Sequence, residues 1–223
     1  AFNQDATGVR LRLTPLDRWR MKLDVGNSRD YTDNFRNGGF YSTINTNRYT
    51  AAWQNDVTVG KDQLLTLGLD YQDDRVGSTT NYAVKERNNK GAFVQHQGKF
   101  GAHDMLVALR QDDNEQFGAH DTGNLAWGYA LAPTLRARLS YGTAFKAPSF
   151  NQLYWPTSYG NPNLQPEQSE SYEAGLHGKQ SWGGWDVRAY QTNIDNLITT
   201  VSSTATNVGK ARIKGLETDV STL

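Results

Sequence analysis

Apolar and polar side chains alternate with a period of two residues over most of this chain. At 65–71 every second residue is Leu or Tyr, and at 124–131 Leu, Trp, Tyr and Leu alternate with Asn, Ala, Gly and Ala. Successive side chains of a β-strand point to opposite faces of a sheet, whereas a helix would place apolar residues three and four positions apart. The pattern therefore predicts strands with one apolar and one polar face.

About eleven segments show this alternation. Their expected spans are 8–13, 19–28, 46–57, 63–72, 89–100, 105–113, 122–131, 135–145, 168–179, 185–198 and 207–220. Most contain about ten residues, which is the length of a tilted strand that crosses a bilayer. The expected fold class is all-β, with consecutive strands antiparallel.

The connections between these strands alternate between short and long. The short ones contain Pro, Gly or Asp and lie at 14–18, 58–62, 101–104, 132–134 and 180–184. The long ones lie at 29–45, 73–88, 114–121, 146–167 and 199–206. Consecutive antiparallel strands place all short turns at one end of the sheet and all long loops at the other, which is typical of outer-membrane barrels.

Alternation alone is also compatible with a soluble β-sandwich or barrel, in which apolar faces meet in a dry core. The one-sided distribution of long connections favours the membrane barrel instead. Aromatic residues favour it too, because such rings are enriched at membrane–water boundaries. Those beside short turns are Trp19, Phe100 and Trp185, and those at the long-loop ends are Tyr71, Tyr141 and Phe145.

The composition excludes several classes of function. The 23 basic and 23 acidic residues balance, so the chain has no overall attraction to nucleic acid. There is no Cys, the four His residues fit no metal-ligand spacing, and phosphate-binding or nucleophile motifs are missing. We therefore expect no catalytic residue, no metal, no cofactor and no enzyme. Mean hydropathy is −0.70, and no apolar run is long enough for a transmembrane helix.

Four segments between 138 and 218 together resemble signature blocks of the TonB-dependent outer-membrane receptors. They are 140–150 (SYGTAFKAPSF), 160–167 (GNPNLQPE), 193–198 (NIDNLI) and 207–217 (NVGKARIKGLE). Residues 28–31 (SRDY) and 110–118 (RQDDNEQFG) are similar to the cobalamin-transporting branch of that family. The resemblance implies TonB-dependent uptake of cobalamin, or of a similar nutrient, through the outer membrane of a Gram-negative bacterium. A siderophore or haem receptor of the same family, and a soluble all-β binding or structural domain, are the alternatives.

The resemblance also implies a barrel of about 22 strands, an N-terminal plug inside it and a plug segment that binds TonB. Residues 1–223 then form a partial β-barrel domain, an antiparallel transmembrane segment with about half the strands, and no plug or TonB-binding segment precedes the first strand. We expect a fragment of a longer polypeptide in contact with outer-membrane lipid. Its two unpaired edges would favour self-association of the fragment.

The resemblance and the exposed aromatic residues suggest ligand contacts on two long loops. Tyr31, Thr32 and Ser42 are the candidates in 29–45, and Tyr154 and Tyr159 are the candidates in 146–167. Ordinary loop packing is the alternative role for all five, because Pro, Asn and aromatic residues are common in loops.

Two further groups of charged residues have an expected location. Solvated loops, rather than calcium sites, are expected for Asp70, Asp73, Asp74, Asp112, Asp113 and Glu115. Lys210, Arg212 and Lys214 alternate on one strand face, and a basic side chain in the lipid costs about 2–4 kcal/mol at mid-depth. We therefore expect these three to point into the lumen.

Overall fold

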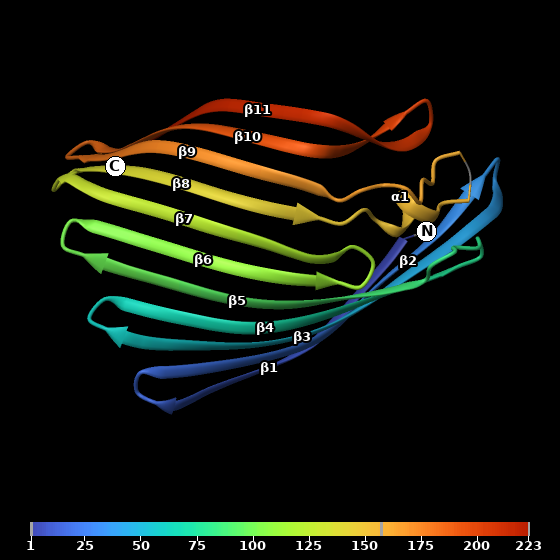
Figure 1. The fold of residues 1–223 in the computed structure, drawn as a ribbon, viewed down its shortest axis with the longest axis horizontal. Helices are drawn as coiled ribbons and strands as arrows, with labels where there is room; N and C mark the ends of the chain where they lie inside the picture. Colours follow the sequence, from blue (N-terminus) through green and yellow to red (C-terminus); the bar gives the residue numbers. More distant parts are fainter. Residues whose placement is uncertain (1, 157, 223) are drawn as a thin grey trace.

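The computed structural model describes residues 2–156 and 158–222, which form one antiparallel sheet of eleven strands in chain order (Figure 1). The strands are β1 (Phe2–Leu16), β2 (Trp19–Arg36), β3 (Gly39–Gly60), β4 (Gln63–Ser78), β5 (Glu86–Phe100), β6 (His103–Asn114), β7 (Gly118–Ala132), β8 (Leu135–Lys146), β9 (Glu167–Gln180), β10 (Gly183–Val201) and β11 (Thr204–Thr222). A short helix, α1 (Phe150–Tyr154), lies in the connection between β8 and β9. The number, order and antiparallel pairing of the predicted strands are confirmed.

Most of the expected long loops are strand extensions, and this part of the prediction was wrong. The segment 29–45 is a hairpin in which β2 and β3 pair up to a two-residue turn at Asn37 and Gly38. Both turn residues have positive φ, 50° and 79°, as a tight hairpin turn requires. Polar residues continue the hydrogen-bonded ladder beyond the apolar part of each strand, so loss of apolar alternation does not mark the strand end. Among the described residues, 147–166 is the longest connection.

The register divides the sheet into an apolar and a polar face. Residues that pair across strands share a face, and one such row links Trp19, Val57, Leu65, His96, Val107, Leu125, Tyr141 and Tyr172. The adjacent positions of each strand point the other way and include most of the charged residues. We call these two surfaces the apolar face and the polar face.

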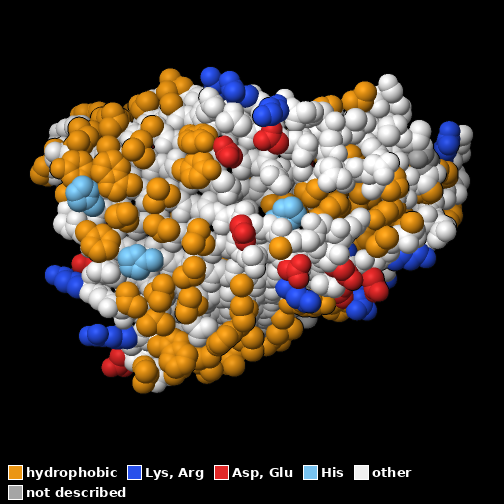
Figure 2. Space-filling view, viewed as in Figure 1, with side chains coloured by type: hydrophobic (Ala, Val, Ile, Leu, Met, Phe, Trp, Pro, Cys, Tyr) orange, Lys and Arg blue, Asp and Glu red, His pale blue; other side chains and the backbone are white. Residues whose placement is uncertain are grey.

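Large hydrophobic side chains of the apolar face are exposed. Leu69 is 52% exposed, Leu109 61% and Leu139 49%. Figure 2 shows hydrophobic side chains spread over the short-turn end of the molecule. Burial of a Leu side chain is worth about 1.5–3 kcal/mol, so a face this apolar requires a non-aqueous environment.

The alternative of a soluble sandwich is wrong for this chain. In the part of the chain that the structure describes there is a single sheet, and no second sheet covers its apolar face. The buried hydrophobic residues all lie at the long-loop end, namely Val76, Tyr82, Phe150, Leu153, Leu164 and Ala205. Within the same residues, no helix is long and apolar enough to cross a membrane.

Aromatic rings occupy the short-turn end of the apolar face, as predicted. Trp19 begins β2, and Phe100 ends β5. His103, Trp127 and Tyr129 form a stack with centroid distances of 4.7–5.9 Å, and Trp127 Nε1 donates a hydrogen bond to His103 Nδ1 (3.1 Å). A ring with a polar edge satisfies both sides of a membrane boundary.

The prediction that Lys210, Arg212 and Lys214 face the lumen was wrong. Lys214 pairs with Gln191, which pairs with Tyr172, so all three basic residues lie on the apolar face. On that face they follow Val220, Thr218 and Leu216 toward the long-loop end, and Val208 lies beyond them.

Candidate functional site

Ion pairs cover the polar face near the long-loop end. The Arg110 guanidinium donates two hydrogen bonds to Asp70 (2.7 and 2.9 Å) and two to Asp112 (2.7 and 2.6 Å). Arg48 donates to both carboxylate oxygens of Asp74 (2.6 and 3.0 Å). Such bidentate pairs fix both partners in orientation, so this charged wall is ordered before any ligand arrives.

A polar hollow of about 350 Å³ lies on this wall. Its lining residues are Arg48, Asp70, Gln72, Asp74, Arg87, Asn88, Asn89, Arg110, Asp112, Asn114, Phe145 and Ala147. Amides and guanidinium groups alternate with carboxylates, so the hollow offers donors and acceptors to a polar ligand. Within the described residues, no group of three or more His, Asp or Glu side chains could hold a metal ion.

The segment with α1 packs over the polar face at this end. Ser149 caps α1: its hydroxyl accepts from the Gln152 amide N–H, and the Gln152 side chain accepts from the Ser149 N–H. The Arg87 guanidinium donates to the Pro148 carbonyl (2.9 Å) and lies 5.0 Å from the centroid of the Phe150 ring. These contacts attach the β8–β9 connection to β5.

Tyr82 attaches the same connection to the β4–β5 loop. It is 2% exposed, packs with Val76 and Phe150, and donates a hydrogen bond from its hydroxyl to Asn151 Oδ1 (2.6 Å). Burial raises the pKa of Tyr82 to about 12, because the phenolate would lose its hydration. The phenol therefore remains a hydrogen-bond donor at physiological pH.

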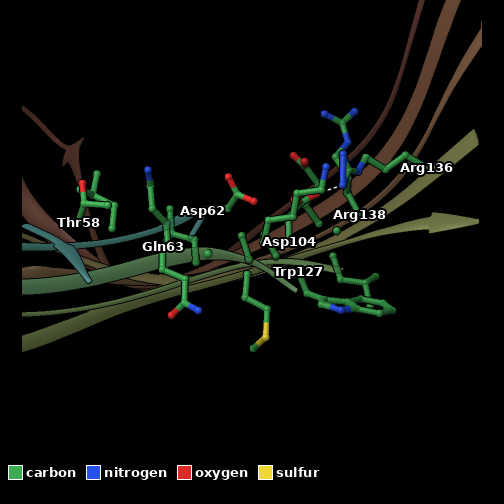
Figure 3. A pocket seen from close by; sticks show the side chains of 18 residues that line it. Thr58, Asp62, Gln63, Asp104, Trp127, Arg136 and Arg138 are labelled. Atoms are coloured by element: carbon green, nitrogen blue, oxygen red, sulfur yellow. Dashed lines mark ion pairs between the residues drawn. The ribbon is translucent and has the colours of Figure 1, made fainter. Parts of the chain in front are cut away.

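The other end of the polar face carries a second set of ion pairs. Arg136 pairs with Asp104, Arg138 pairs with Asp186, and Arg188 lies 2.9 Å from Glu217. Figure 3 shows Asp104, Arg136 and Arg138 on one side of the sheet and Gln63 and Trp127 on the other. The separation of polar and apolar faces therefore persists to the short turns.

The structure places three predicted ligand residues on the β2–β3 hairpin. Tyr31 is on the apolar-face side, where the Arg29 guanidinium lies 5.8 Å from its ring centroid. Thr32 is on the polar-face side, half-buried and paired with Ile44. Ser42 is on the same side but 0% exposed, and its hydroxyl accepts from the Asn34 side chain (3.1 Å).

The two predicted residues of 146–167 take part in loop packing. Tyr154 is in α1, and its hydroxyl accepts a hydrogen bond from Gln116 Nε2. Tyr159 packs on the cluster of Leu153, Leu164 and Ala205, and its carbonyl accepts from the Ala205 N–H (2.8 Å). The structure thus brings Tyr154 and Tyr159 to the same loop assembly, while Tyr31 points away from the polar face.

Sequence reasoning missed the ion pairs of the polar face. Asp70, Asp74 and Asp112 were assigned to solvated loops, but all three lie on strands. The alternation indicated which of these carboxylates lie together, because Asp70 and Asp74 share one face of β4 while Asp73 lies on the other. Their Arg partners are 26 and 40 residues away along the chain, so pairing required the register.

Comparison with known proteins agrees with this architecture. The family model described as "TonB dependent receptor-like, beta-barrel" matches residues 1–222. This chain belongs to the TonB-dependent receptor β-barrel family. In that family the polar face lines the interior of the barrel, and the apolar face contacts lipid.

Curated members of the TonB-dependent receptor family are similar in sequence. The vitamin B12 transporter BtuB of Photobacterium profundum is 35% identical over 211 residues, which cover 90% of this chain and 35% of that protein. BtuB of Vibrio cholerae is 33% identical over 210 residues, covering 90% and 34%. The chain therefore spans about a third of the length of these relatives.

Two solved structures share the fold. The siderophore receptor PirA of Pseudomonas aeruginosa superposes with a TM-score of 0.75 at 15% identity, covering 98% of this chain and 53% of PirA. The copper transporter OprC gives a TM-score of 0.78 at 18% identity, covering 97% and 42%. These likenesses support the barrel architecture alone, because the identities are low.

Proposed function

We propose that this chain is part of a Gram-negative outer-membrane receptor that takes up cobalamin in a TonB-dependent manner. The identity of 35% over 90% of the chain to a vitamin B12 transporter is the observation that carries the proposal. In this assignment the short turns face the periplasm and the long-loop end faces the medium. The chain contributes wall and binding surface, and no catalytic step is assigned to it.

The polar face supports passage of a polar solute. A nutrient as large and polar as cobalamin needs a wide lumen with hydrogen-bonding groups, since an apolar wall would leave its polar atoms unpaired. The ordered pairs of Arg48 with Asp74 and of Arg110 with Asp70 and Asp112 supply such groups without a large net charge. A plug and its TonB-binding segment, contributed by the remainder of the receptor, would close the lumen between transport events.

Capture would take place at the long-loop end. Thr32 is the best placed of the five candidates, because it is partly exposed on the polar-face side of a rigid hairpin. Tyr154 and Tyr159 would contact the ligand through the loop assembly that holds them. Ser42 needs a local rearrangement before it can touch a ligand, and Tyr31 would have to be approached from outside the hairpin.

Uptake by a strain that needs external cobalamin and lacks its own receptor tests the proposal. Expression of the full-length receptor should restore growth on cobalamin, and deletion of TonB should abolish it. Purified receptor should bind cobalamin in equilibrium dialysis, and Thr32→Trp should weaken binding more than Tyr31→Trp because only residue 32 faces the lumen. Binding of a ferric siderophore or haem, with none of cobalamin, would overturn the assignment.

The second candidate function is uptake of a ferric siderophore. The siderophore receptor PirA shares the barrel fold over 98% of this chain, which makes this ligand class the alternative to cobalamin. The sequence identity is 15%, less than half of that to the vitamin B12 transporters. Competition between cobalamin and a ferric siderophore for the same purified receptor separates the two candidates.

A further inference from the structure

Three basic residues project from the apolar face of β11. Lys210, Arg212 and Lys214 occupy alternate positions and are all exposed. Alternate residues of a strand are about 6.6–6.8 Å apart, so the three side chains form a basic row about 13 Å long. We call this surface the β11 basic row.

The β11 basic row lies where the outward surface changes from apolar to polar. On β11 the outward residues nearer the short turns are Val220, Thr218 and Leu216, and the basic row follows them directly. On β10 the outward order is Trp185, Val187 and Ala189, followed by Gln191, Asn193 and Asp195, and the outward pair of Leu197 and Val208 lies beyond this polar stretch. The change occurs at the same distance along both strands, which places the row at the long-loop boundary of the lipid-facing band.

The outward side chains of β10 leave most of this positive charge uncompensated. Lys210 Nζ lies 3.6 Å from Asp195 Oδ1, but the two side chains are 87% and 57% exposed, so the pair is weak. Arg212 Nε donates to Asn193 Oδ1 (3.0 Å), which is a neutral acceptor. The residue paired with Lys214 is the uncharged Gln191. Three cations therefore face one carboxylate on the outward side of β10 and β11.

We infer that the β11 basic row binds the phosphate groups of an anionic lipid in the outward-facing leaflet. Lys and Arg form charge-assisted hydrogen bonds to phosphate oxygens, and long basic side chains reach from a strand surface to the headgroup level. The Asn193 and Gln191 amides add neutral donors beside the cations. The inference rests on the membrane orientation in the proposed function, but it concerns the lipid-facing side and leaves the lumen unaffected.

Lipid retention by the full-length receptor tests this site. Receptor in mixed micelles of phosphatidylcholine and diphosphorylated lipid A should retain lipid A, counted by native mass spectrometry. The triple variant Lys210→Gln, Arg212→Gln, Lys214→Gln should lose affinity about five-fold per residue, because a basic residue near an anionic membrane surface contributes about a factor of this size. Added salt should weaken wild-type retention and have little effect on the variant.

Lys90→Gln is the matched control. Lys90 also projects from the apolar face at the long-loop end, but it pairs across the strands with Asp113. Its replacement should leave lipid A retention unchanged. Lys210→Arg with Lys214→Arg should retain wild-type binding, and heat-modifiable gel migration verifies that each barrel is folded.

Four results separate a lipid site from a site for a free anion and from the cobalamin site. Equal retention by wild type and a folded triple variant would overturn the inference. Equal competition by inorganic phosphate would assign the row to a free anion and would also overturn it. Cobalamin binding should be the same in wild type and triple variant. A receptor that retains lipid A but binds no cobalamin would contradict the proposed function alone.

Discussion

Gly91 lies directly beneath an ion pair of the polar face. A Cβ atom at this position would lie 2.1 Å from Arg110 Nη2 and 2.7 Å from Asp70 Oδ1. Gly91→Ala should therefore displace the Arg110 side chain and break its pair with Asp70. Because both side chains are partly exposed, 33% and 27%, we expect a loss of about 1 kcal/mol in unfolding free energy.

Urea unfolding in detergent measures the effect of Gly91→Ala. Gly77→Ala is the control, since its nearest neighbour would be 3.9 Å away on the side chain of Asn45. The control should be neutral or slightly stabilising, because Ala restricts the unfolded chain more than Gly does. Equal stability of the two variants would show that Arg110 finds another partner without cost.

Tyr82 should make docking of the β8–β9 connection sensitive to alkaline pH. Its pKa in the folded protein, about 12, is above its ordinary value of about 10. Because the pKa of Tyr82 is higher in the folded than in the unfolded protein, the stabilisation by its protonated hydroxyl is fully present below the unfolded pKa. This stabilisation is lost as pH rises through the folded pKa. The window is therefore pH 10 to 12. Tyrosinate absorbance should show a late-titrating ring that Tyr82→Phe removes. Loss of no late-titrating absorbance in Tyr82→Phe would contradict the burial argument.

At the scale of elements, α1 depends on its N-terminal cap. A helix of five residues has almost no intrinsic stability, so the Ser149–Gln152 capping box is a large part of what maintains it. Ser149→Ala should cost about 1 kcal/mol, and Ser149→Asp should preserve the cap. Hydrogen exchange should become faster in 150–154 with Ala and not with Asp. Faster exchange spread over the strands would instead indicate damage to the barrel.

The strands could be predicted because each has an apolar and a polar face, and this leaves a period of two in the sequence. Their ends could not, since Tyr31 and Ser42 belong to a hairpin whose two faces are both largely polar. The site was the least predictable part. The contact of Tyr154 with Gln116 joins two connections that meet only in the folded chain, and the burial of Ser42 within a polar hairpin leaves no pattern in the sequence. The β11 basic row was predicted on the wrong face, because the cost of a charge in lipid outweighed the parity that Lys214 shares with Leu216 and Val220.

At the scale of the whole molecule, the two edge strands run in the same direction. β1 begins at the long-loop end of the sheet and finishes at the short-turn end, and β11 does the same (Figure 1). In an antiparallel barrel the strands between β11 and β1 must therefore be odd in number. Two copies of residues 1–223 in one orientation cannot close such a barrel, because β11 of one would run parallel to β1 of the other.

Self-association of the isolated chain in detergent should therefore pair β1 with β1 of an inverted copy. In such a two-fold antiparallel pair, the middle residue of β1 lies opposite the same residue of the other copy. The first residues of one β1 lie opposite the last residues of the other. Val9 is the midpoint of Phe2–Leu16, and the chain contains no natural Cys. Val9→Cys should form an intermolecular disulfide readily, whereas Asn3→Cys should not. Efficient cross-linking of Asn3→Cys would indicate parallel pairing, and would mean that the direction of the edge strands does not control how two copies meet. A purely monomeric light-scattering signal would exclude the association itself.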